Sequence, residues 1–207
     1  MNPDDRIYVI DDDASMRDSL RFLLEARGLA VETYGSARDF LAAGGVDRDG
    51  CLVVDVRMPD MTGLELQQRL ADQKSRLRVV VITGHADVAM AVTAMKAGAV
   101  DFIEKPFSDD TLLDSIGRAL EQSRQLSARV AVSADIAGRL ENLTAREREV
   151  LDHLITGKPH KVIAHALNIS PRTIEVHRGR IMQKLGARNL ADLVRMAIAA
   201  GQRTAGS

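Results

Sequence analysis

Cysteine and aromatic residues are scarce in this chain of 207 residues. Cys51 is the only cysteine, which excludes an intrachain disulfide and a metal site built from several cysteines. It begins an apolar run, so we expect an inert thiol in the core. Aromatic residues make up 3% of the sequence and tryptophan is absent, which argues against a protein that binds single-stranded nucleic acid by base stacking.

Long apolar runs are also missing from the sequence. No stretch is long and apolar enough to span a bilayer, and the first residues lack the basic and apolar segments of a signal peptide. We therefore expect a cytoplasmic protein that has no membrane partner.

The formal net charge of −1 conceals two halves of opposite charge. Residues 1–139 hold 17 Lys and Arg against 23 Asp and Glu, a balance of −6. Residues 140–207 hold 11 against 6, a balance of +5. A basic segment of this kind favours a nucleic-acid partner for the second half of the chain.

Four short apolar runs, at 7–10, 51–54, 79–82 and 99–103, end in polar residues. Such runs are typical of strands that are buried on both faces of a parallel sheet. The carboxyl ends of parallel strands share one edge, which is where α/β proteins bind their ligands. The polar residues that follow the four runs are Asp11, Asp12 and Asp13, then Asp55, then Thr83, and finally Glu104 and Lys105.

Segments with helical spacing separate these strands. Apolar residues recur with a helical period over 15–27, 63–73 and 87–97, further helices begin near Ser36 and Ser108, and 29–34 adds another strand. Five strand–helix repeats imply a parallel sheet that is covered by helices on both faces.

The order and spacing of these motifs over residues 5–122 resemble the receiver domain of bacterial two-component response regulators. Taken singly, each motif would more often be a helix-capping acid or a solvated lysine, but the four together favour a receiver. The resemblance implies a flavodoxin-like α/β fold with a five-stranded parallel sheet in the order 2-1-3-4-5. It also assigns Asp55 as the residue that accepts a phosphoryl group.

An acidic cluster that accepts an anionic phosphoryl group needs a divalent cation to offset its charge. Mg²⁺ prefers a few carboxylates, a carbonyl and several waters. The resemblance implies a Mg²⁺ (or Mn²⁺) site that is formed by Asp12, Asp55 and the backbone carbonyl of Arg57, with Asp11 acting through water.

The same resemblance assigns roles in switching. Thr83 and Lys105 would contact the phosphoryl group, and the peptide bond before Pro106 is commonly cis in the family. Phe102 would turn inward when Thr83 moves. A plain strand aromatic is the alternative, but its position three residues before Lys105 is where the family keeps its switch aromatic. The exposed face that changes as a result would form a dimer contact through Val92 and Lys96.

The basic half reads as four helices. Thr144 and Glu147 form a capping box at the first, Ser170 and Pro171 begin the third, and Gly186 ends it. Two helices joined by a tight turn, with charge on the second, indicate a helix-turn-helix at about 160–180.

Residues 140–202 resemble the LuxR-type DNA-binding domain. The strings that carry this resemblance are Leu143-Thr-Ala-Arg-Glu-Arg-Glu-Val-Leu151, Lys161-Val-Ile-Ala164, Ile169-Ser170 and Thr173-Ile-Glu-Val-His-Arg178.

On a helical wheel of the third helix, Ile174, Ile181 and Leu185 face the core. The opposite sector is available to the major groove of DNA, although a merely solvated face is the alternative. The residues predicted to contact DNA are Lys161, Arg172, Thr173, Glu175, Val176, Arg178, Gly179, Arg180, Gln183 and Lys184.

We therefore predict a receiver domain at 1–122, a partly helical and exposed linker at 123–139, and a four-helix LuxR-type domain at 140–207.

The chain resembles response regulators of the NarL/FixJ type. That resemblance implies phosphorylation by a sensor histidine kinase, dimerisation, binding of double-stranded promoter DNA and contact with RNA polymerase. Residues 81–107 look particularly like regulators that activate nitrogen-fixation genes under low oxygen. No enzymatic activity is expected beyond slow self-dephosphorylation.

Two other readings of the sequence were open at this point. One is a phosphatase of the haloacid-dehalogenase type, which also uses Asp and Mg²⁺ but carries its nucleophile in an Asp-x-Asp motif after the first strand. Here the first strand ends in three consecutive acids, and the candidate nucleophile Asp55 ends the third. The other is a receiver domain with an RNA-binding or protein-binding output.

Overall fold

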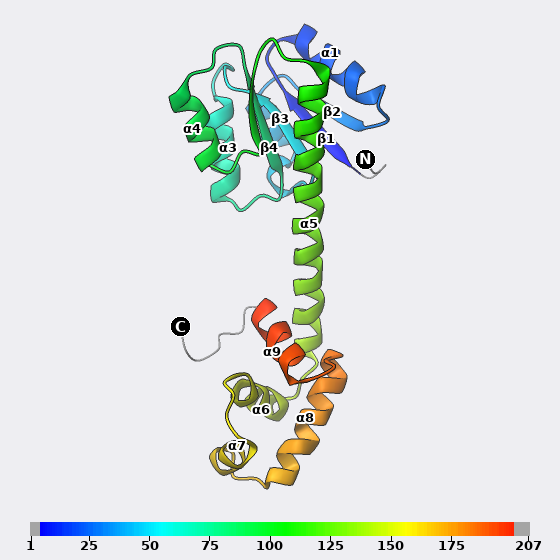
Figure 1. Ribbon diagram of the computed structural model, residues 1–207, viewed down its shortest axis with the longest axis vertical. Helices are drawn as coiled ribbons and strands as arrows, with labels where there is room; N and C mark the ends of the chain where they lie inside the picture. Colours follow the sequence, from blue (N-terminus) through cyan, green and yellow to red (C-terminus); the bar gives the residue numbers. More distant parts are fainter. Residues whose placement is uncertain (1–4, 201–207) are drawn as a thin grey trace. The chain divides into compact units, whose positions relative to one another are not determined.

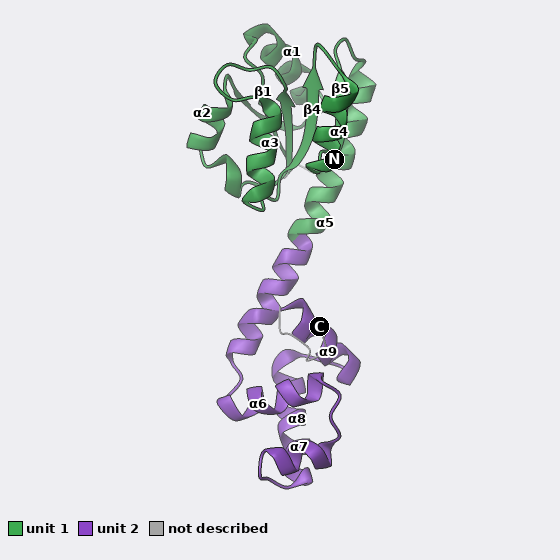
Figure 2. Ribbon diagram, turned by 90° about the vertical axis from the view of Figure 1, so that its left-hand side faces the viewer, with its two compact units in different colours: residues 1–127 green, residues 128–207 purple. Residues whose placement is uncertain are grey.

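The computed structural model describes residues 5–200. Its chain divides into two compact units, Met1–Ser127 and Ala128–Ser207 (Figure 2). None of the helices in the described range is both long and apolar enough to cross a membrane.

A five-stranded sheet forms the centre of the N-terminal unit (Figure 1). The strands are β1 (Arg6–Ile10), β2 (Ala30–Tyr34), β3 (Cys51–Asp55), β4 (Arg78–Thr83) and β5 (Asp101–Glu104). All neighbours pair in parallel, in the order β2-β1-β3-β4-β5. This is the predicted order, so the flavodoxin-like α/β fold is confirmed.

Helices cover both faces of this sheet. They are α1 (Ala14–Glu25), α2 (Ala37–Ala42), α3 (Gly63–Asp72), α4 (Val88–Lys96) and α5 (Asp109–Glu141), with a short 3₁₀ helix, η1, at Gly45–Asp47. Leu24 of α1 and Ile116 of α5 belong to the apolar core on one face. Phe40, Leu66 and Ala94, from α2, α3 and α4, belong to the core on the other face.

The central strand β3 is buried along its whole length. Cys51 is fully buried at its first position, and burial raises the pKa of the thiol. A thiol that stays protonated is a poor nucleophile, which agrees with the inert core thiol expected from the sequence.

Helix α5 is continuous from Asp109 to Glu141, and the division between the two compact units falls within it. The prediction of a partly helical linker over 123–139 was wrong in helix content, because all of these residues are helical. The segment is rich in good helix formers, with one glycine and no proline. Nor is it exposed throughout, since Ser123 and Ile136 are buried. The domain boundaries at 122 and 139 stay predictions.

The C-terminal unit contains α6 (Ala145–Ile155), α7 (His160–Ala166), α8 (Pro171–Leu185) and α9 (Leu190–Ala199). The capping box of Thr144 and Glu147 begins α6 as predicted, and Ser170 caps α8. Gly186 ends α8 in the left-handed region, at φ 71°. The core that these helices share also includes Ile136 and Leu140 from the end of α5. The helical fold of this unit is thus confirmed.

Candidate functional site

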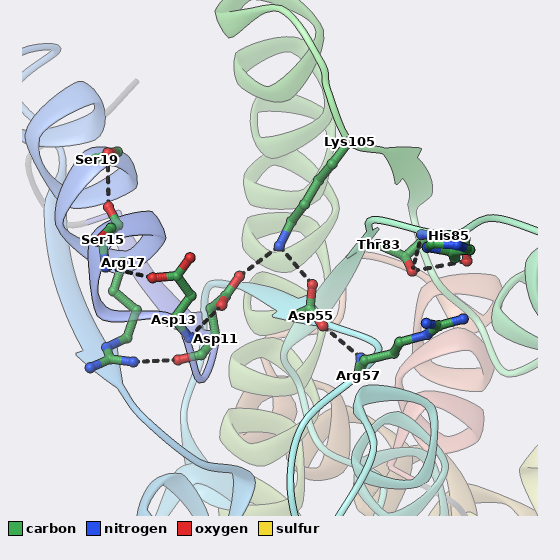
Figure 3. Close-up of polar contacts among 10 residues, drawn as sticks. All are labelled: Asp11, Asp13, Ser15, Arg17, Ser19, Asp55, Arg57, Thr83, His85 and Lys105. Atoms are coloured by element: carbon green, nitrogen blue, oxygen red, sulfur yellow. Dashed lines mark hydrogen bonds and ion pairs between the residues drawn. The ribbon is translucent and has the colours of Figure 1, made fainter.

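Three strand ends of the N-terminal unit bring two carboxylates and one ammonium together (Figure 3). Nζ of Lys105, which follows β5, donates to Oδ2 of Asp11 at 2.8 Å and to Oδ1 of Asp55 at 2.7 Å. Asp11 follows β1 and Asp55 ends β3, and their exposed fractions are 1% and 6%. The predicted meeting of these three residues at one edge of the sheet is confirmed.

The charges in this cluster do not balance, because two carboxylates face a single ammonium. Burial lowers the pKa of Lys105, but its hydrogen bonds and charge interactions with Asp11 and Asp55 outweigh burial, so the pKa is raised overall. Lys105 is therefore an ammonium at neutral pH. The excess negative charge that remains attracts a further cation to the edge.

The position of Asp55 is fixed by its backbone as well as by Lys105. The amide of Arg57 donates to Oδ2 of Asp55 at 2.6 Å, so both carboxylate oxygens are engaged. Gly63, the first residue of α3, packs against this strand end. A Cβ atom at Gly63 would lie 2.2 Å from the carbonyl oxygen of Asp55, so only glycine fits there.

Asp11 is held from the opposite side of the cluster. The amide of Asp13 donates to its Oδ1 at 2.9 Å, and Nη1 of Arg17 donates to its backbone carbonyl at 2.6 Å. Our sequence reasoning missed both Arg17 and Gly63. The available signals were an arginine in the first turn after the acidic triplet, and a glycine that begins a helix just after the Asp55 strand.

The donor set fits Mg²⁺ or Mn²⁺ in its chemistry. Mg²⁺ usually binds through one or two carboxylates and keeps several waters, and the edge offers two buried carboxylates with uncompensated negative charge. Asp12 is exposed beside them. Within residues 5–200, no group of three or more His, Cys, Asp or Glu side chains is placed to hold a metal.

Thr83 is fully buried at the end of β4, and its hydroxyl is directed to the loop that precedes α4. Its Oγ1 donates to the carbonyl of His85 at 3.1 Å and accepts from the amide of His85 at 3.3 Å (Figure 3). Its own carbonyl accepts from the amide of Lys105 at 2.7 Å. The strand ends of Thr83 and Lys105 are therefore adjacent, but contact with a phosphoryl group requires the hydroxyl to leave His85.

The other residues predicted for switching and dimerisation lie on β5, just after β5 and on α4. The peptide bond between Lys105 and Pro106 is cis, as expected. Phe102 is half-buried and packs against the core beneath α2, α3 and α4. Val92 and Lys96 are exposed on α4. Val92 lies in an apolar patch of that helix that also exposes Val88 and Met95.

Helix α8 of the C-terminal unit separates a buried face from an exposed one. Ile174, Ile181 and Leu185 are fully buried, as predicted. The opposite side is exposed and mixes two cations with small and polar groups. Its members are Arg172, Glu175, Val176, Gly179, Arg180 and Gln183.

The other predicted DNA contacts differ in their exposure. Lys161 on α7 is exposed, whereas Thr173 is half-buried in the first turn of α8. Arg178 is half-buried, and within residues 5–200 its buried Nε has no hydrogen-bond partner. Nζ of Lys184 donates to Oε2 of Glu147 at 2.7 Å. A DNA contact by Lys184 would therefore compete with an internal ion pair.

Two family models match the two units of the chain. A model described as "Response regulator receiver domain" matches residues 7–117, and one described as "Bacterial regulatory proteins, luxR family" matches residues 141–197. The chain belongs to the response regulators that join a receiver domain to a LuxR-type DNA-binding domain.

This response regulator is 50% identical over 195 residues to the transcriptional regulatory protein FixJ of Rhizobium meliloti (strain 1021), covering 94% of this chain and 96% of the relative. The solved structure of the response regulator StyR matches with a TM-score of 0.80 and 41% identity, covering 93% and 98% of the two chains. Full-length FixJ from B. japonicum matches with a TM-score of 0.58 and 48% identity, covering 97% and 98%.

The family assignment decides between the readings that the sequence left open. Its members regulate transcription, so the haloacid-dehalogenase-type phosphatase is set aside. The LuxR-type match likewise favours a DNA-binding output over an RNA-binding or protein-binding one.

Proposed function

We propose that Asp55 of this response regulator accepts a phosphoryl group from a sensor histidine kinase. The observation that supports this most directly is Lys105, which donates to Asp55 and Asp11 from one ammonium. In the transfer, the N–P bond of the phosphohistidine breaks as a carboxylate oxygen of Asp55 forms an O–P bond. The imidazole nitrogen leaves with the electron pair.

Phosphoryl transfer depends mainly on in-line positioning and on neutralisation of charge. The amide of Arg57 orients the Asp55 carboxylate, and Lys105 remains charged beside this carboxylate, which attacks phosphorus. Asp11, Asp12, Asp55 and the carbonyl of Arg57 would hold Mg²⁺ or Mn²⁺, which supplies further positive charge when bound. Slow hydrolysis of the acyl phosphate by water resets the site.

Phosphorylation adds nearly two negative charges and three acceptor oxygens to a buried edge. Thr83 then exchanges its contact with His85 for one with the phosphoryl group, and Phe102 turns into the space that is vacated. The exposed face of α4, with Val92 and Lys96, forms the contact between two phosphorylated copies. Dimerisation on this face supplies the pairing that two-fold DNA sites require.

The C-terminal unit binds promoter DNA through the exposed side of α8 and activates transcription with RNA polymerase in the cytoplasm. Phosphate contacts position such a unit, whereas contacts to base edges select the sequence. The resemblance of residues 81–107 to nitrogen-fixation regulators, together with the 50% identity to FixJ, supports nitrogen-fixation genes under low oxygen as the target. The predicted contacts are Lys161, Arg172, Thr173, Glu175, Val176, Arg178, Gly179, Arg180, Gln183 and Lys184.

The phosphoacceptor role is tested by Asp55→Asn. The variant is expected to take up no hydroxylamine-sensitive label from a radioactive acyl phosphate in the presence of Mg²⁺, because its amide is not a nucleophile for this reaction. Asp60→Asn, an exposed aspartate beyond the same strand, is the matched control and should label normally. Undiminished label on Asp55→Asn would overturn the assignment.

The coupling of the two units is tested on the unaltered chain. Phosphorylation should raise both the dimer fraction measured by light scattering and the affinity for duplex DNA. Equal mass and equal affinity with and without acyl phosphate would refute this part of the proposal while leaving the phosphoacceptor assignment intact.

A further inference from the structure

The final turn of α5 supplies a hydrogen-bond donor to the C-terminal end of α8. Nη1 of Arg139 donates to the carbonyl of Leu185 at 3.1 Å, and Leu185 is the last residue of α8. Carbonyls in the last turn of a helix have no partner within the helix. The amide of Gly186 donates to the carbonyls of Gln183 and Met182. Arg139 therefore supplies the Leu185 carbonyl with a donor that neither α8 nor its Gly186 cap provides.

The guanidinium of Arg139 has a second partner on α5 and lies close to Gly186. Its Nη2 pairs with Oδ2 of Asp135, one turn earlier on α5, at 2.8 Å. On the other side, a Cβ atom at Gly186 would lie 2.8 Å from Nη1. A cation at the C-terminal end of a helix also interacts favourably with the helix dipole. The Asp135 pair and the helix dipole thus both favour the contact of Arg139 with α8, and Gly186 leaves room for it.

The surrounding part of α5 belongs to the same packed unit. Ile136 and Leu140 are buried in the core that α6, α7, α8 and α9 share. Oγ of Ser133 donates to the carbonyl of Ala199, the last residue of α9, at 2.7 Å. The end of α5 therefore donates to the C-terminal ends of both α8 and α9, and acts as a fifth helix of the C-terminal unit.

We infer that Arg139 is a positioning residue for DNA recognition. It fixes the C-terminal end of α8 in the orientation from which Arg172, Arg180 and Gln183 meet a duplex, and does not touch DNA itself. This inference rests on the proposed role of α8.

The experiment uses the full-length chain and two duplexes of equal length. One is selected from a random library by the unaltered chain, and the other is unrelated in sequence. Arg139→Ala is expected to lose about tenfold in affinity for the selected duplex and at most about twofold for the unrelated one. The salt dependence should stay unchanged, because no phosphate contact is removed.

Conservative and matched variants complete the test. Arg139→Lys keeps a cationic donor and should recover most of the affinity for the selected duplex. Arg129→Ala removes the same charge from an exposed position on the same helix and should change neither affinity. Thermal unfolding of each variant separates a loss of folded protein from a loss of recognition.

Three outcomes would overturn the inference. Equal weakening on both duplexes with a smaller salt dependence would make Arg139 a direct phosphate contact. A lower melting temperature with an unchanged ratio of the two affinities would make it purely structural. Unchanged binding would leave it without a role. Arg180→Ala, measured in parallel, separates this inference from the proposed role of α8. If Arg180→Ala also has no effect, the proposed role of α8 fails. If it weakens binding while Arg139→Ala does not, only the inference about Arg139 fails.

Discussion

The carboxyl edge of the sheet and the outer side of α8 both carry charged side chains, but they hold them differently. At the edge, Lys105 is paired with two buried carboxylates that lie 94 and 50 positions away in the sequence. On α8, Arg172 and Arg180 are exposed. Paired charges shielded from water respond strongly to any change in local charge. Exposed cations instead attract a polyanion and release its counterions. The first arrangement suits a switch and the second a contact surface.

The largest effect that this comparison predicts is on stability. Lys105→Ala leaves Asp11 and Asp55 facing each other without their counterion, and should lower the free energy of unfolding by about 3 kcal/mol at pH 7. Urea unfolding followed by circular dichroism measures the loss. Lys96→Ala, which removes an exposed lysine, is the control and should be nearly neutral. Similar values for the two variants would contradict the difference between buried and exposed charges.

The same ion pairs give a pH dependence with a defined sign. The pKa of Lys105 is raised above its ordinary 10.5, so its contribution to stability is complete below that pH. The contribution is lost as the pH rises through the raised pKa. Combining Lys105→Ala with Asp11→Asn should recover part of the lost stability, because only one carboxylate then remains in the cluster. Mg²⁺ should stabilise the single variant more than the double variant.

A smaller effect is expected on the exposed side of α8. The double variant Arg172→Ala, Arg180→Ala should lose about a hundredfold in affinity for duplex DNA and lower the salt slope by about two, with little change in stability. Arg38→Ala with Arg69→Ala removes the same charge from exposed positions of the N-terminal unit and serves as control. Fluorescence anisotropy across a salt series measures both quantities. Equal losses in the two double variants would indicate attraction by net charge alone.

The smallest predicted effect concerns the ion pair between the buried Glu147 and the exposed Lys184 of α8. Glu147 is 3% exposed, and its hydrogen bond from Lys184, reinforced by those from Thr144, lowers its pKa from 4.5 to about 2. Glu147→Gln should cost about 1–2 kcal/mol at neutral pH.

The pH dependence of this pair has the opposite sign to that of Lys105. Since the pKa of Glu147 is depressed in the folded state, its contribution is complete above about pH 4.5 and is lost as the pH falls towards 2. The free energies of unfolding of the unaltered chain and of Glu147→Gln should therefore converge as the pH is lowered from 7 to 2. The matched control is Glu65→Gln, since Glu65 belongs to the exposed capping box of α3. A difference between chain and variant that persists at pH 2 would contradict the assignment.

The parts predicted best from the sequence depend on local patterns. The apolar runs that become β1, β3 and β4 are largely buried strands, whereas β5 lies at the edge of the sheet and only its Ile103 is buried. The ends of these strands meet where the strand-end rule placed them. The helical wheel of α8 separated Ile174 and Ile181 from the exposed side correctly. Apolar residues that are buried on one face of a helix or strand recur with the period of that element. Such features can therefore be predicted from the sequence pattern.

The parts that were missed depend on partners distant in sequence. Lys184 lies on the helix that carries the predicted contacts, but its ammonium pairs with Glu147, 37 positions earlier. Ile136 and Leu140 lie in a segment with weak periodicity and are buried only because α6 to α9 fold against it. No local pattern records any of these contacts.

The position of Cys51 in the middle strand has a practical consequence. Because the single sulfhydryl of the chain is enclosed between both helical layers, no disulfide can join two folded copies. A cysteine introduced on α4 or α8 would then be the one thiol open to a maleimide dye. The native sequence thus already provides a background for single-site fluorescent labelling.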